Sequence, residues 1–545
     1  MNIEDTENAN ATTQQKTIID KYNINNSNNT PITIYLNGVP TKAYVGTRIS
    51  DVLSMELPCG GHGKCGKCKI KGAGALSPLT ESEKKHLTEK EITDGIRLGC
   101  HTYILGECSI ESLSESSEAS VLTDGIKLKA ELFPTFNKYA AAVDIGTTTV
   151  AARLIDTNGS ALAELGINNP QSVFGADVIS RIEASLAGKD GELKELIVNT
   201  LDSLVNALCE GAKISPKDID AIAVTGNTVM LYLLTGTSPE PLSHAPFALT
   251  RKFNETLSAK ELGLKSVSPQ TEIYLPPCIS AFIGADTVCA ILSSGMLGNW
   301  ENTAPSTDEN TITSSLSENK AFLLADIGTN GEMALANNGT LFVCSTAAGP
   351  AFEGVGISRG MRGEKGAIDK VALVNGKLEA TVIGGGEAKG ICGSGLVDAV
   401  AALLDSEELD ETGYLEDDEV TVLSPITLTA KDIRAVQLAK SAISAGICTL
   451  INEAGVSEDV IEALFIAGGF GNYLNKKSAA RIGLLPEKLT EKTVNIGNAA
   501  LSGAEMLLLN GKLRKFAEDF SHKANVVELS TSKYFSDKFI SGMLF

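Results

Sequence analysis

Four cysteines in the N-terminal part of the chain have the spacing of metal-cluster ligands. Cys59, Cys65 and Cys68 form a C-x5-C-x2-C pattern, and Cys100 follows after 31 intervening residues. Glycines lie between the first three cysteines, and glycine allows the tight backbone turns that aim N–H groups at cluster sulfurs. Four thiolates held in this way are the ligand set of a [2Fe–2S] cluster. The pattern therefore predicts a cluster that carries electrons.

A structural zinc site is the alternative, because C-x2-C is also a zinc-binding pair. Structural zinc sites usually present two such pairs, whereas this chain has three close cysteines and one distant one. His62 and His101 lie beside the cysteines. With four thiolates available, we interpret both histidines as hydrogen-bonding or solvent-facing residues rather than ligands.

Two further segments repeat one pattern at an interval of 182 residues. An apolar strand runs into Asp144-Ile-Gly146-Thr147-Thr148-Thr149, and a second one runs into Asp326-Ile-Gly328-Thr329-Asn330. Glycine lets a phosphate approach the backbone, threonine hydroxyls donate to it, and an aspartate can hold Mg²⁺ directly or through water. Packing alone does not require the aspartates, because a buried carboxylate is costly without a partner. The repeat predicts twin lobes that face each other across a nucleotide cleft.

Other segments rich in small residues complete this predicted cleft. Gly393-Ser394-Gly395 opens a predicted helix, whose N-terminus suits a phosphate or a ribose. Gly468-Gly469-Phe-Gly471 follows a predicted strand, at a turn where an adenine ring can lie. Residues 496–505 form a small-residue helix suited to close packing between lobes. The nucleotide motif is neither a Walker loop nor a Rossmann fingerprint, since neither pattern occurs.

Composition and charge narrow the class of protein. The chain has 545 residues, with 43% hydrophobic but only 5% aromatic residues and 52 glycines, which fits a multidomain α/β protein. Its formal charge of -21 argues against nucleic acid and anionic membranes as partners. No signal peptide and no apolar run of about 18 residues is evident. The remaining cysteines occur singly, so we expect a cytoplasmic protein in a reducing compartment.

Changes in composition suggest the domain boundaries. Residues 1–31 are rich in Asn, Thr and Gln and are expected to be a disordered tail. Residues 32–113 begin with a predicted hairpin and carry the four cysteines, and residues 114–137 are a polar linker. The remaining residues are expected to form one nucleotide-binding domain. Its parts are a first lobe at 138–318, a second lobe at 319–495, and a return helix with a C-terminal segment at 496–545.

These motifs resemble two known folds. The order of hairpin, helix and cluster loop is similar to a β-grasp [2Fe–2S] ferredoxin, and the first cysteine gap resembles the adrenodoxin type. The two Asp-Ile-Gly-Thr hairpins look like the acetate and sugar kinase, heat-shock chaperone and actin (ASKHA) fold. The expected fold class is therefore α/β and α+β multidomain. It combines an N-terminal β-grasp ferredoxin domain with a C-terminal two-lobed, actin-like ASKHA ATPase domain.

The whole chain resembles the reductive activators of corrinoid proteins. The likeness also rests on Asn169-Pro-Gln, Gly175-Ala-Asp-Val-Ile-Ser-Arg181, Cys344-Ser-Thr-Ala-Ala-Gly-Pro-Ala-Phe-Glu353-Gly and Gly390-Ile-Cys-Gly-Ser-Gly395. It implies a one-electron reduction of an inactive Co(II) corrinoid protein of a methyltransferase system to Co(I). The electron would come from the [2Fe–2S] cluster, with ATP and Mg²⁺ supplying the driving force. A low-potential ferredoxin or flavin reductase would reduce the cluster, and a homodimer is a further option.

The resemblance also assigns roles to single residues. Asp144 and Asp326 would hold phosphates and metal, and Glu332 would position the attacking water or else form a structural salt bridge. Ser345 is expected in a loop that contacts the corrinoid partner. Family members can carry a middle domain between the linker and the ATPase domain. Only about 25 residues separate the two here, so this middle domain is expected to be absent.

Three other functions use parts of the same motifs. Activators of 2-hydroxyacyl-CoA dehydratases share the ATPase fold and deliver an electron, but they look shorter and hold a [4Fe–4S] cluster between subunits. A small-molecule kinase with an accessory ferredoxin domain needs an acceptor pocket with a general base, which the sequence does not reveal. A plain electron carrier leaves the two Asp-Ile-Gly-Thr hairpins without a purpose.

Overall fold

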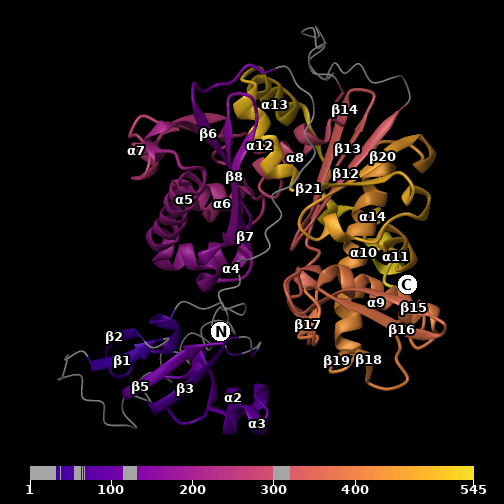
Figure 1. The fold of residues 1–545 in the computed structure, drawn as a ribbon. Coiled ribbons are helices and arrows are strands. Elements are labelled where there is room, and N and C mark those ends of the chain that lie inside the picture. Colours follow the sequence, from indigo (N-terminus) through magenta and orange to yellow (C-terminus); the bar gives the residue numbers. More distant parts are fainter. Residues whose placement is uncertain are drawn as a thin grey trace. The chain divides into compact units, whose positions relative to one another are not determined.

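A computed structural model describes residues 32–36, 39–53, 63, 66, 68–113, 132–298 and 320–545 of the chain. These residues divide into two units, the first containing the elements up to β5 together with Ser172–Ala176, and the second containing the helices and strands labelled from β6 to α14 (Figure 1). The expected tail, the linker as far as residue 131 and the polar stretch at 299–319 lie outside the described residues.

A five-stranded mixed sheet forms the N-terminal unit. The strand order is β2-β1-β5-β3-β4, in which β1 and β5 are parallel and the other neighbours antiparallel. Alternating residues such as Ile34, Ile70 and Ile110 point into one apolar core. The β1–β2 pairing, with Leu36 opposite Val39, confirms the predicted hairpin. The elements are β1 (Ile32–Leu36), β2 (Val39–Ala43), β3 (Lys69–Leu76), α2 (Glu81–His86), α3 (Glu89–Thr93), β4 (Ile96–Leu98) and β5 (Ile104–Ser112).

The first lobe of the second unit contains a six-stranded sheet in the order β10-β11-β9-β6-β7-β8. Its centre is the β6–β7 hairpin, with β8 antiparallel on one side and β9 parallel on the other. Helices α5 and α6 lie on one side of the sheet and α12 on the other (Figure 1). The elements are β6 (Tyr139–Ile145), β7 (Thr149–Asp156), β8 (Ala161–Asn168), α4 (Val178–Ala184), α5 (Asp190–Ala212), β9 (Ile219–Gly226), α6 (Thr228–Thr235), β10 (Glu255–Ser258), α7 (Ala259–Leu262), β11 (Glu272–Leu275) and α8 (Ala285–Ser294).

The second lobe repeats this arrangement. Its six-stranded sheet has the order β21-β20-β12-β13-β14-β22, with the β12–β13 hairpin extended by antiparallel β14 and parallel β20. Smaller sheets of β15–β17 and of β18–β19 belong to the same lobe. The elements are β12 (Ala321–Ile327), β13 (Gly331–Asn337), β14 (Thr340–Thr346), β15 (Ala367–Val374), β16 (Lys377–Val382), β17 (Gly390–Ile391), α9 (Gly393–Asp405), β18 (Glu419–Leu423), β19 (Ile426–Thr429), α10 (Ala430–Glu453), β20 (Ile461–Ala467), α11 (Lys476–Arg481), β21 (Thr493–Gly497), α12 (Ala499–Leu509), α13 (Lys512–Lys523), β22 (Asn525–Val526) and α14 (Lys533–Ser541).

Helices α8 and α12 join the two lobes through a shared core. Their apolar residues pack with Ala140 and Ala142 of the first sheet and with Leu324 and Ala334 of the second. A buried ion pair of 2.5 Å between Arg153 of β7 and Glu505 of α12 fastens the return helix to the first lobe. The two lobes are therefore held in one body by the elements that cross between them.

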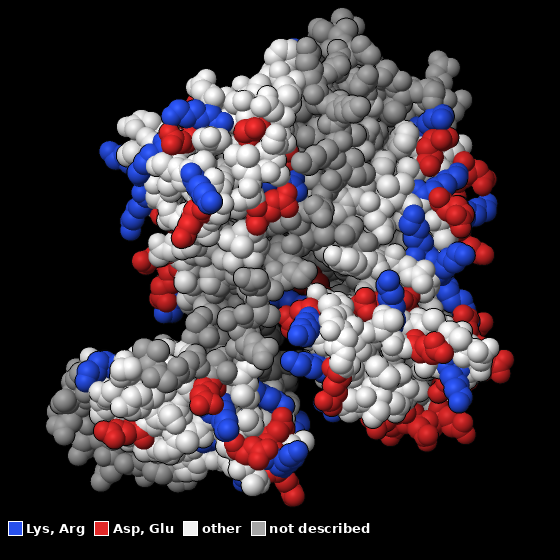
Figure 2. All heavy atoms as spheres, viewed as in Figure 1, with Lys and Arg blue, Asp and Glu red and all other residues white. Residues whose placement is uncertain are grey.

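The face of the molecule shown in Figure 2 has no single sign of charge. Lysine, arginine, aspartate and glutamate side chains are interspersed on the face shown in Figure 2. A search of the described residues finds no helix with the length and apolar character needed to cross a membrane.

Candidate functional site

A cavity of 310 Å³ lies between the two lobes, and both Asp-Ile-Gly-Thr turns line it. Most of the site residues predicted from the sequence meet there. They are Asp144, Gly146, Thr147, Thr148, Thr149, Asp326, Gly328, Thr329, Asn330, Glu332, Gly393, Ser394, Gly468 and Gly469. Residues that are distant in the sequence thus line one cavity, as expected for a cleft between twin lobes.

Two predicted glycines do not line the cavity. A Cβ at Gly395 would overlap the carbonyl of Ile368, and one at Gly471 would overlap the side chain of Ile466. Both glycines therefore serve close packing inside the second lobe. Neither glycine is on the wall of the cavity, and the expectation that they contact a nucleotide stays a prediction.

The strand period explains why both aspartates point into the cleft. Side chains alternate between the two faces of a strand, so Asp144 shares a face with Ala140 and Ala142, and Asp326 shares one with Leu324. These are the faces that pack toward α8 and α12. Asn498, the N-cap of α12, donates from Nδ2 to Asp144 over 3.1 Å and accepts from the N–H of Leu501.

Asp286 is a site residue that the sequence analysis missed. It lies in the first turn of α8 and lines the cavity. Gly284 makes this position possible, because a Cβ there would stand 2.6 Å from Asn227 Cα and 2.7 Å from Asp286 Oδ1. The signal available in the sequence was the Gly284-Ala-Asp286 start of an apolar helix, which a local pattern alone does not mark as functional.

The acidic side chains of the cleft raise one another's pKa values. Burial and the charge of Asp286 raise the pKa of Asp144 to about 8 and that of Asp326 to about 7. Burial raises the pKa of Asp286 itself to about 6. Burial, Asp286 and Asp326 together raise the pKa of Glu332 well above its usual range. Such a cluster of repelling carboxyl groups is stabilised by a cation.

Mg²⁺ fits this donor set only together with a nucleotide. Among the described residues, no three His, Cys, Asp or Glu side chains are arranged to hold a metal ion by themselves. Mg²⁺ usually keeps several waters and binds through one or two carboxylates plus substrate phosphates. Asp144 and Asp326 can supply those carboxylates, so the cleft suits a magnesium–nucleotide complex better than a bare metal ion.

Buried polar side chains hold the backbone of the first Asp-Ile-Gly-Thr turn through hydrogen bonds to its carbonyl groups. Asn169 donates from Nδ2 to the carbonyl of Gly146 at 2.8 Å and from its backbone N–H to the carbonyl of Thr148 at 2.9 Å. Arg181 donates to the carbonyl of Thr147 at 2.5 Å. In a trans peptide the N–H points away from the carbonyl of the same peptide. The N–H groups of Thr147, Thr148 and Thr149 therefore point away from Asn169 and Arg181. Asn169 and Arg181 belong to motifs whose role the sequence had left open.

One carboxylate contacts both Asp-Ile-Gly-Thr turns, at residues 144–149 and 326–330, which we call the phosphate turns. Thr148 of the first turn donates to Glu353 Oε2 at 2.7 Å, and Thr329 of the second turn donates to Glu353 Oε1 at 2.8 Å. Next to it, the ring of Phe352 stacks on Phe470 with centroids 4.8 Å apart. Both rings line the cavity beside Gly468 and Gly469, where the sequence placed an adenine.

Glu332 and Ser345 occupy neighbouring strands. Glu332 of β13 lies opposite Asp326 on one side and opposite Ser345 of β14 on the other. Ser345 was expected in a loop, and this is wrong, because β14 continues its pairing with β13 as far as Thr346. Unlike Glu332, Ser345 does not line the cavity.

The N-terminal unit brings two of the four predicted cluster ligands together. The Sγ atoms of Cys68 and Cys100 lie 3.1 Å apart, and both residues are almost fully buried. The N–H of Gly99 donates to the carbonyl of Cys68 at 2.8 Å, which ties the two cysteine segments together. Cys59 and Cys65 lie outside the described residues. The described pair fits a thiolate-bound cluster, since both sulfurs can reach the same group.

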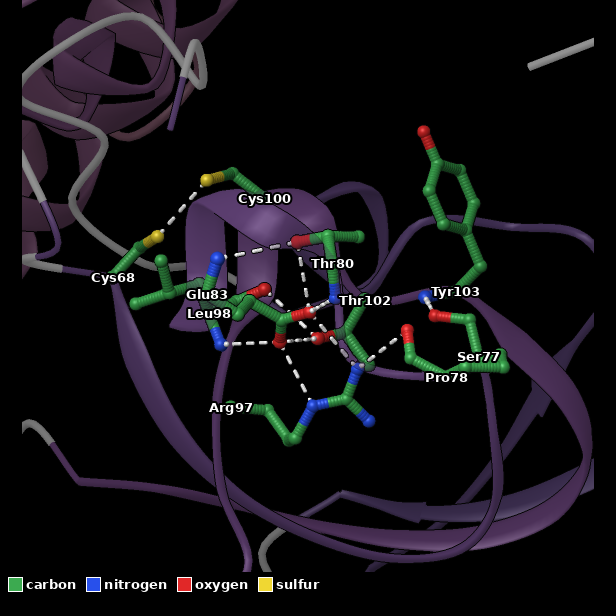
Figure 3. Close-up of polar contacts among 10 residues, drawn as sticks. All are labelled: Cys68, Ser77, Pro78, Thr80, Glu83, Arg97, Leu98, Cys100, Thr102 and Tyr103. Atoms are coloured by element: carbon green, nitrogen blue, oxygen red, sulfur yellow. Dashed lines mark hydrogen bonds and ion pairs between the residues drawn. The ribbon is translucent and has the colours of Figure 1, made fainter. Parts of the chain in front are cut away.

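A buried carboxylate organises the backbone around Cys100. Glu83 accepts from Arg97 Nε at 2.8 Å, from the N–H of Leu98 at 3.2 Å and from Thr102 Oγ1 at 3.1 Å (Figure 3). Burial alone would raise the pKa of Glu83, but the hydrogen bonds and charge of Arg97 and the backbone N–H donors leave it below its usual value. Leu98 and Thr102 flank Cys100, so this network holds the turn that presents the thiol.

Comparisons with known proteins agree with this architecture. A family model described as the C-terminal domain of RACo, the ASKHA domain, matches residues 320–545, and one described as the RACo middle region matches residues 139–299. The corrinoid activation enzyme RamQ of Eubacterium limosum is 33% identical over 438 residues, which are 75% of this chain and 70% of that protein. The [Co(II) methylated amine-specific corrinoid protein] reductase of Methanosarcina barkeri is 26% identical over 436 residues, covering 74% of this chain and 76% of that one.

A solved structure extends the likeness to nearly the whole chain. The reductive activator for corrinoid, iron-sulfur protein has a TM-score of 0.67 and 26% identity, and the match covers 94% of this chain and 98% of that one. The match at 139–299 covers the first lobe, so this lobe is the region that the family model describes as middle, and its sheet repeats that of the second lobe. The expectation that no separate domain lies between the linker and the first lobe stays a prediction. The chain belongs to the RACo family of reductive activators of corrinoid proteins.

Proposed function

We propose that this protein reduces a corrinoid protein from Co(II) to Co(I) in an ATP-dependent reaction. One electron passes from a reduced [2Fe–2S] cluster bound by Cys59, Cys65, Cys68 and Cys100 to the cobalt, and one ATP-hydrolysing cleft drives the transfer. The reaction consumes ATP and water and releases ADP and phosphate, while the cluster is oxidised by one electron. The proposed site of action is the cytoplasm, where a low-potential ferredoxin or flavin reductase would re-reduce the cluster.

The observation that carries this proposal is the meeting of Asp144, Asp326 and both phosphate turns on one cavity between two lobes. A nucleotide held there contacts both lobes, so its binding and hydrolysis change the relative stability of open and closed arrangements. ATP can drive an unfavourable electron transfer only through such differential binding of two conformations. The family membership supports the corrinoid protein as the acceptor, because the relatives are named for that activity.

The cleft residues have separate proposed roles in ATP hydrolysis. The turns around Gly146 and Gly328 bind phosphates through N–H and hydroxyl groups, and Asp144 and Asp326 hold Mg²⁺, in part through water. Asp286 and Glu332, which both line the cavity, are the candidates for orienting the attacking water. Catalysis of this kind depends on positioning and charge neutralisation rather than on covalent chemistry.

An anaerobic absorption experiment tests the function. The cluster-reconstituted, chemically reduced protein is mixed with a methylated-amine-specific corrinoid protein in its Co(II) state, with and without MgATP. We expect the Co(I) absorption band to grow only with MgATP. In Asp326→Ala the band should not grow, because the second turn loses its carboxylate, while the cluster absorption should remain.

Each other outcome counts against a defined part of the proposal. Growth of the Co(I) band without ATP would show that the protein is a plain electron carrier. ATP hydrolysis without Co(I), tested across several corrinoid proteins, would favour another low-potential acceptor, as for a dehydratase activator. Transfer of phosphate to a small molecule would favour a kinase, and absence of ATP turnover would remove the mechanism.

A further inference from the structure

Glu353 holds the two phosphate turns with one carboxylate. Its Oε2 accepts from Thr148 at 2.7 Å and its Oε1 accepts from Thr329 at 2.8 Å. Gly328, in the second turn, has its missing Cβ position 3.3 Å from the same Oε1. Glu353 therefore occupies the space between the two turns, on the wall of the cavity.

The two threonines cannot serve Glu353 and a phosphate at the same time. A threonine hydroxyl has a single hydrogen and donates one hydrogen bond. In the arrangement described here, both hydroxyl hydrogens are used by the carboxylate. Phosphate oxygens, like a carboxylate, are acceptors without donors of their own when ionised. Phosphate and Glu353 therefore compete for the hydroxyl hydrogens of Thr148 and Thr329.

Charge adds to this competition. Glu353 shares the cavity with Asp144, Asp286, Asp326 and Glu332, and its charge is one of the causes that raise the pKa of Asp326. A triphosphate brings several further negative charges into the same space, and like charges at such short range repel strongly in a half-buried site. Moving the Glu353 carboxylate away relieves this repulsion at the moment of binding.

The carboxylate is attached to a segment with contacts in both lobes. Residues 350–362, which we call the bridge segment, follow the loop after β14. In this segment Phe352 stacks on Phe470, and the N–H of Ser358 donates to Asp432 in α10 at 2.7 Å. Arg362 donates to Asn168 of the first lobe. A displacement of Glu353 is therefore passed to a segment that already spans the cleft.

We infer that Glu353 and the nucleotide phosphates compete for the hydroxyls of Thr148 and Thr329. Phosphate binding releases the carboxylate, replaces it as the link between the turns, and shifts the bridge segment. This inference rests on the proposed ATP-binding function and adds its regulation. Glu353 sets the nucleotide concentration at which the cleft fills and signals its filling to the rest of the second unit.

Nucleotide binding to the full-length protein tests the competition. Calorimetric titration with Mg²⁺ and the non-hydrolysable analogue AMP-PNP gives the Kd of the wild type, Glu353→Ala and Glu353→Gln. We expect Glu353→Ala to bind about tenfold more tightly, because two charge-assisted hydrogen bonds no longer have to be exchanged. Glu353→Gln keeps the size of the side chain but not its charge, and it should also bind more tightly. Glu387→Ala removes an exposed carboxylate of the same lobe and should leave the Kd unchanged.

The outcomes separate this inference from the proposed function. If the wild type binds AMP-PNP and both Glu353 variants bind it equally or more weakly, the competition is refuted, and weaker binding would make Glu353 a ligand of the nucleotide or its metal. If the wild type binds no nucleotide, the ATP-dependent function itself fails. Circular dichroism and thermal unfolding of both variants check that the fold is intact.

Hydrogen exchange tests the coupling to the bridge segment. AMP-PNP should change the exchange of residues 350–362 in the wild type. The nucleotide-free Glu353→Ala protein should already show a similar change in these residues, since the link to the turns is absent. Exchange identical to that of the nucleotide-free wild type would refute the transmission, even if the affinity changed as expected.

Discussion

Asp144 and Asp326 occupy equivalent positions at the ends of β6 and β12, and the same surroundings act on both. Burial and Asp286 raise their pKa values to about 8 and about 7. A cleft without metal and nucleotide therefore keeps protons on these carboxyl groups near neutral pH. The Mg²⁺ that we propose for this cleft would have to displace those protons, which would couple its binding to pH.

The raised pKa values predict how the stability of the metal-free protein depends on pH. In the unfolded chain both carboxyls lose their protons near pH 4, about three or more units below their values in the folded state. Between these limits the folded state binds more protons, so the free energy of unfolding falls as the pH rises. The expected fall is about 1.4 kcal/mol per pH unit for each carboxyl that stays protonated. Urea unfolding in EDTA between pH 6 and pH 8 measures it.

The matched control is the double variant Asp144→Asn/Asp326→Asn. Its amides do not titrate, so its free energy of unfolding should vary less with pH than that of the wild type. A wild-type free energy that rises over the same range would contradict the assignment of protonated carboxyls in the cleft.

Helices α8 and α12 are the elements that place the site. Asp286 stands in the first turn of α8, and Asn498 caps α12, so both helix N-termini reach the cavity beside the aspartates. The partial positive charge of a helix N-terminus stabilises negative groups there. The depth of both termini in the cleft depends on how closely the two helices pack.

Gly503 sets that packing, and its replacement should disturb it. A Cβ at Gly503 would overlap the backbone carbonyl of Cys289 in α8. Because a backbone group cannot move aside as a side chain can, Gly503→Ala should lower the free energy of unfolding by about 1–3 kcal/mol. It should also weaken nucleotide binding by spreading the helix N-termini. Thermal unfolding and AMP-PNP titration measure the two effects.

Gly191 provides the control for this substitution. It lies in α5, and a Cβ there would meet no atom within 4 Å. Gly191→Ala should leave the stability unchanged or raise it slightly, since alanine favours helix more than glycine does. Equal effects of the two substitutions would show that the α8–α12 contact has no special role.

At the scale of the whole molecule, the cysteine pair Cys68–Cys100 and the cavity between the lobes belong to separate units. The N-terminal unit has its own apolar core, with Ile34, Ile70 and Ile110 among its members. The second unit is built on cores that share no residue with it. Because each site lies in a unit with its own core, a substitution can disable one site and leave the other intact.

Cys100→Ser should therefore separate the two functions. The variant should lose the visible absorption of the cluster, because serine replaces one thiolate of the ligand set. Its Kd for AMP-PNP should stay at the wild-type value. Absorption spectroscopy and calorimetric titration of the same sample measure both properties, and a loss of nucleotide affinity would show that the second unit depends on the cluster.

The sequence by itself predicted the local structure around each motif. The Asp-Ile-Gly-Thr turns, the glycine turn at Gly468 and the start of α9 at Gly393 all follow apolar runs or begin them. Strand alternation, tight turns and helix starts depend on neighbouring residues, so a local pattern encodes them. The repeat of one hairpin 182 residues later was sufficient to predict twin lobes and their cleft.

Only the tertiary structure decided which further residues reach the cleft. Asp286, Glu353 and Asn498 come from a helix start, a short turn after β14 and a helix cap, and none of these carries a local signature of nucleotide binding. Their convergence depends on the packing of α8 and α12 between the two sheets. The same holds for Gly395 and Gly471, whose packing contacts are invisible in the sequence. Contacts between distant segments are set by the whole core, and a short sequence window does not contain that information.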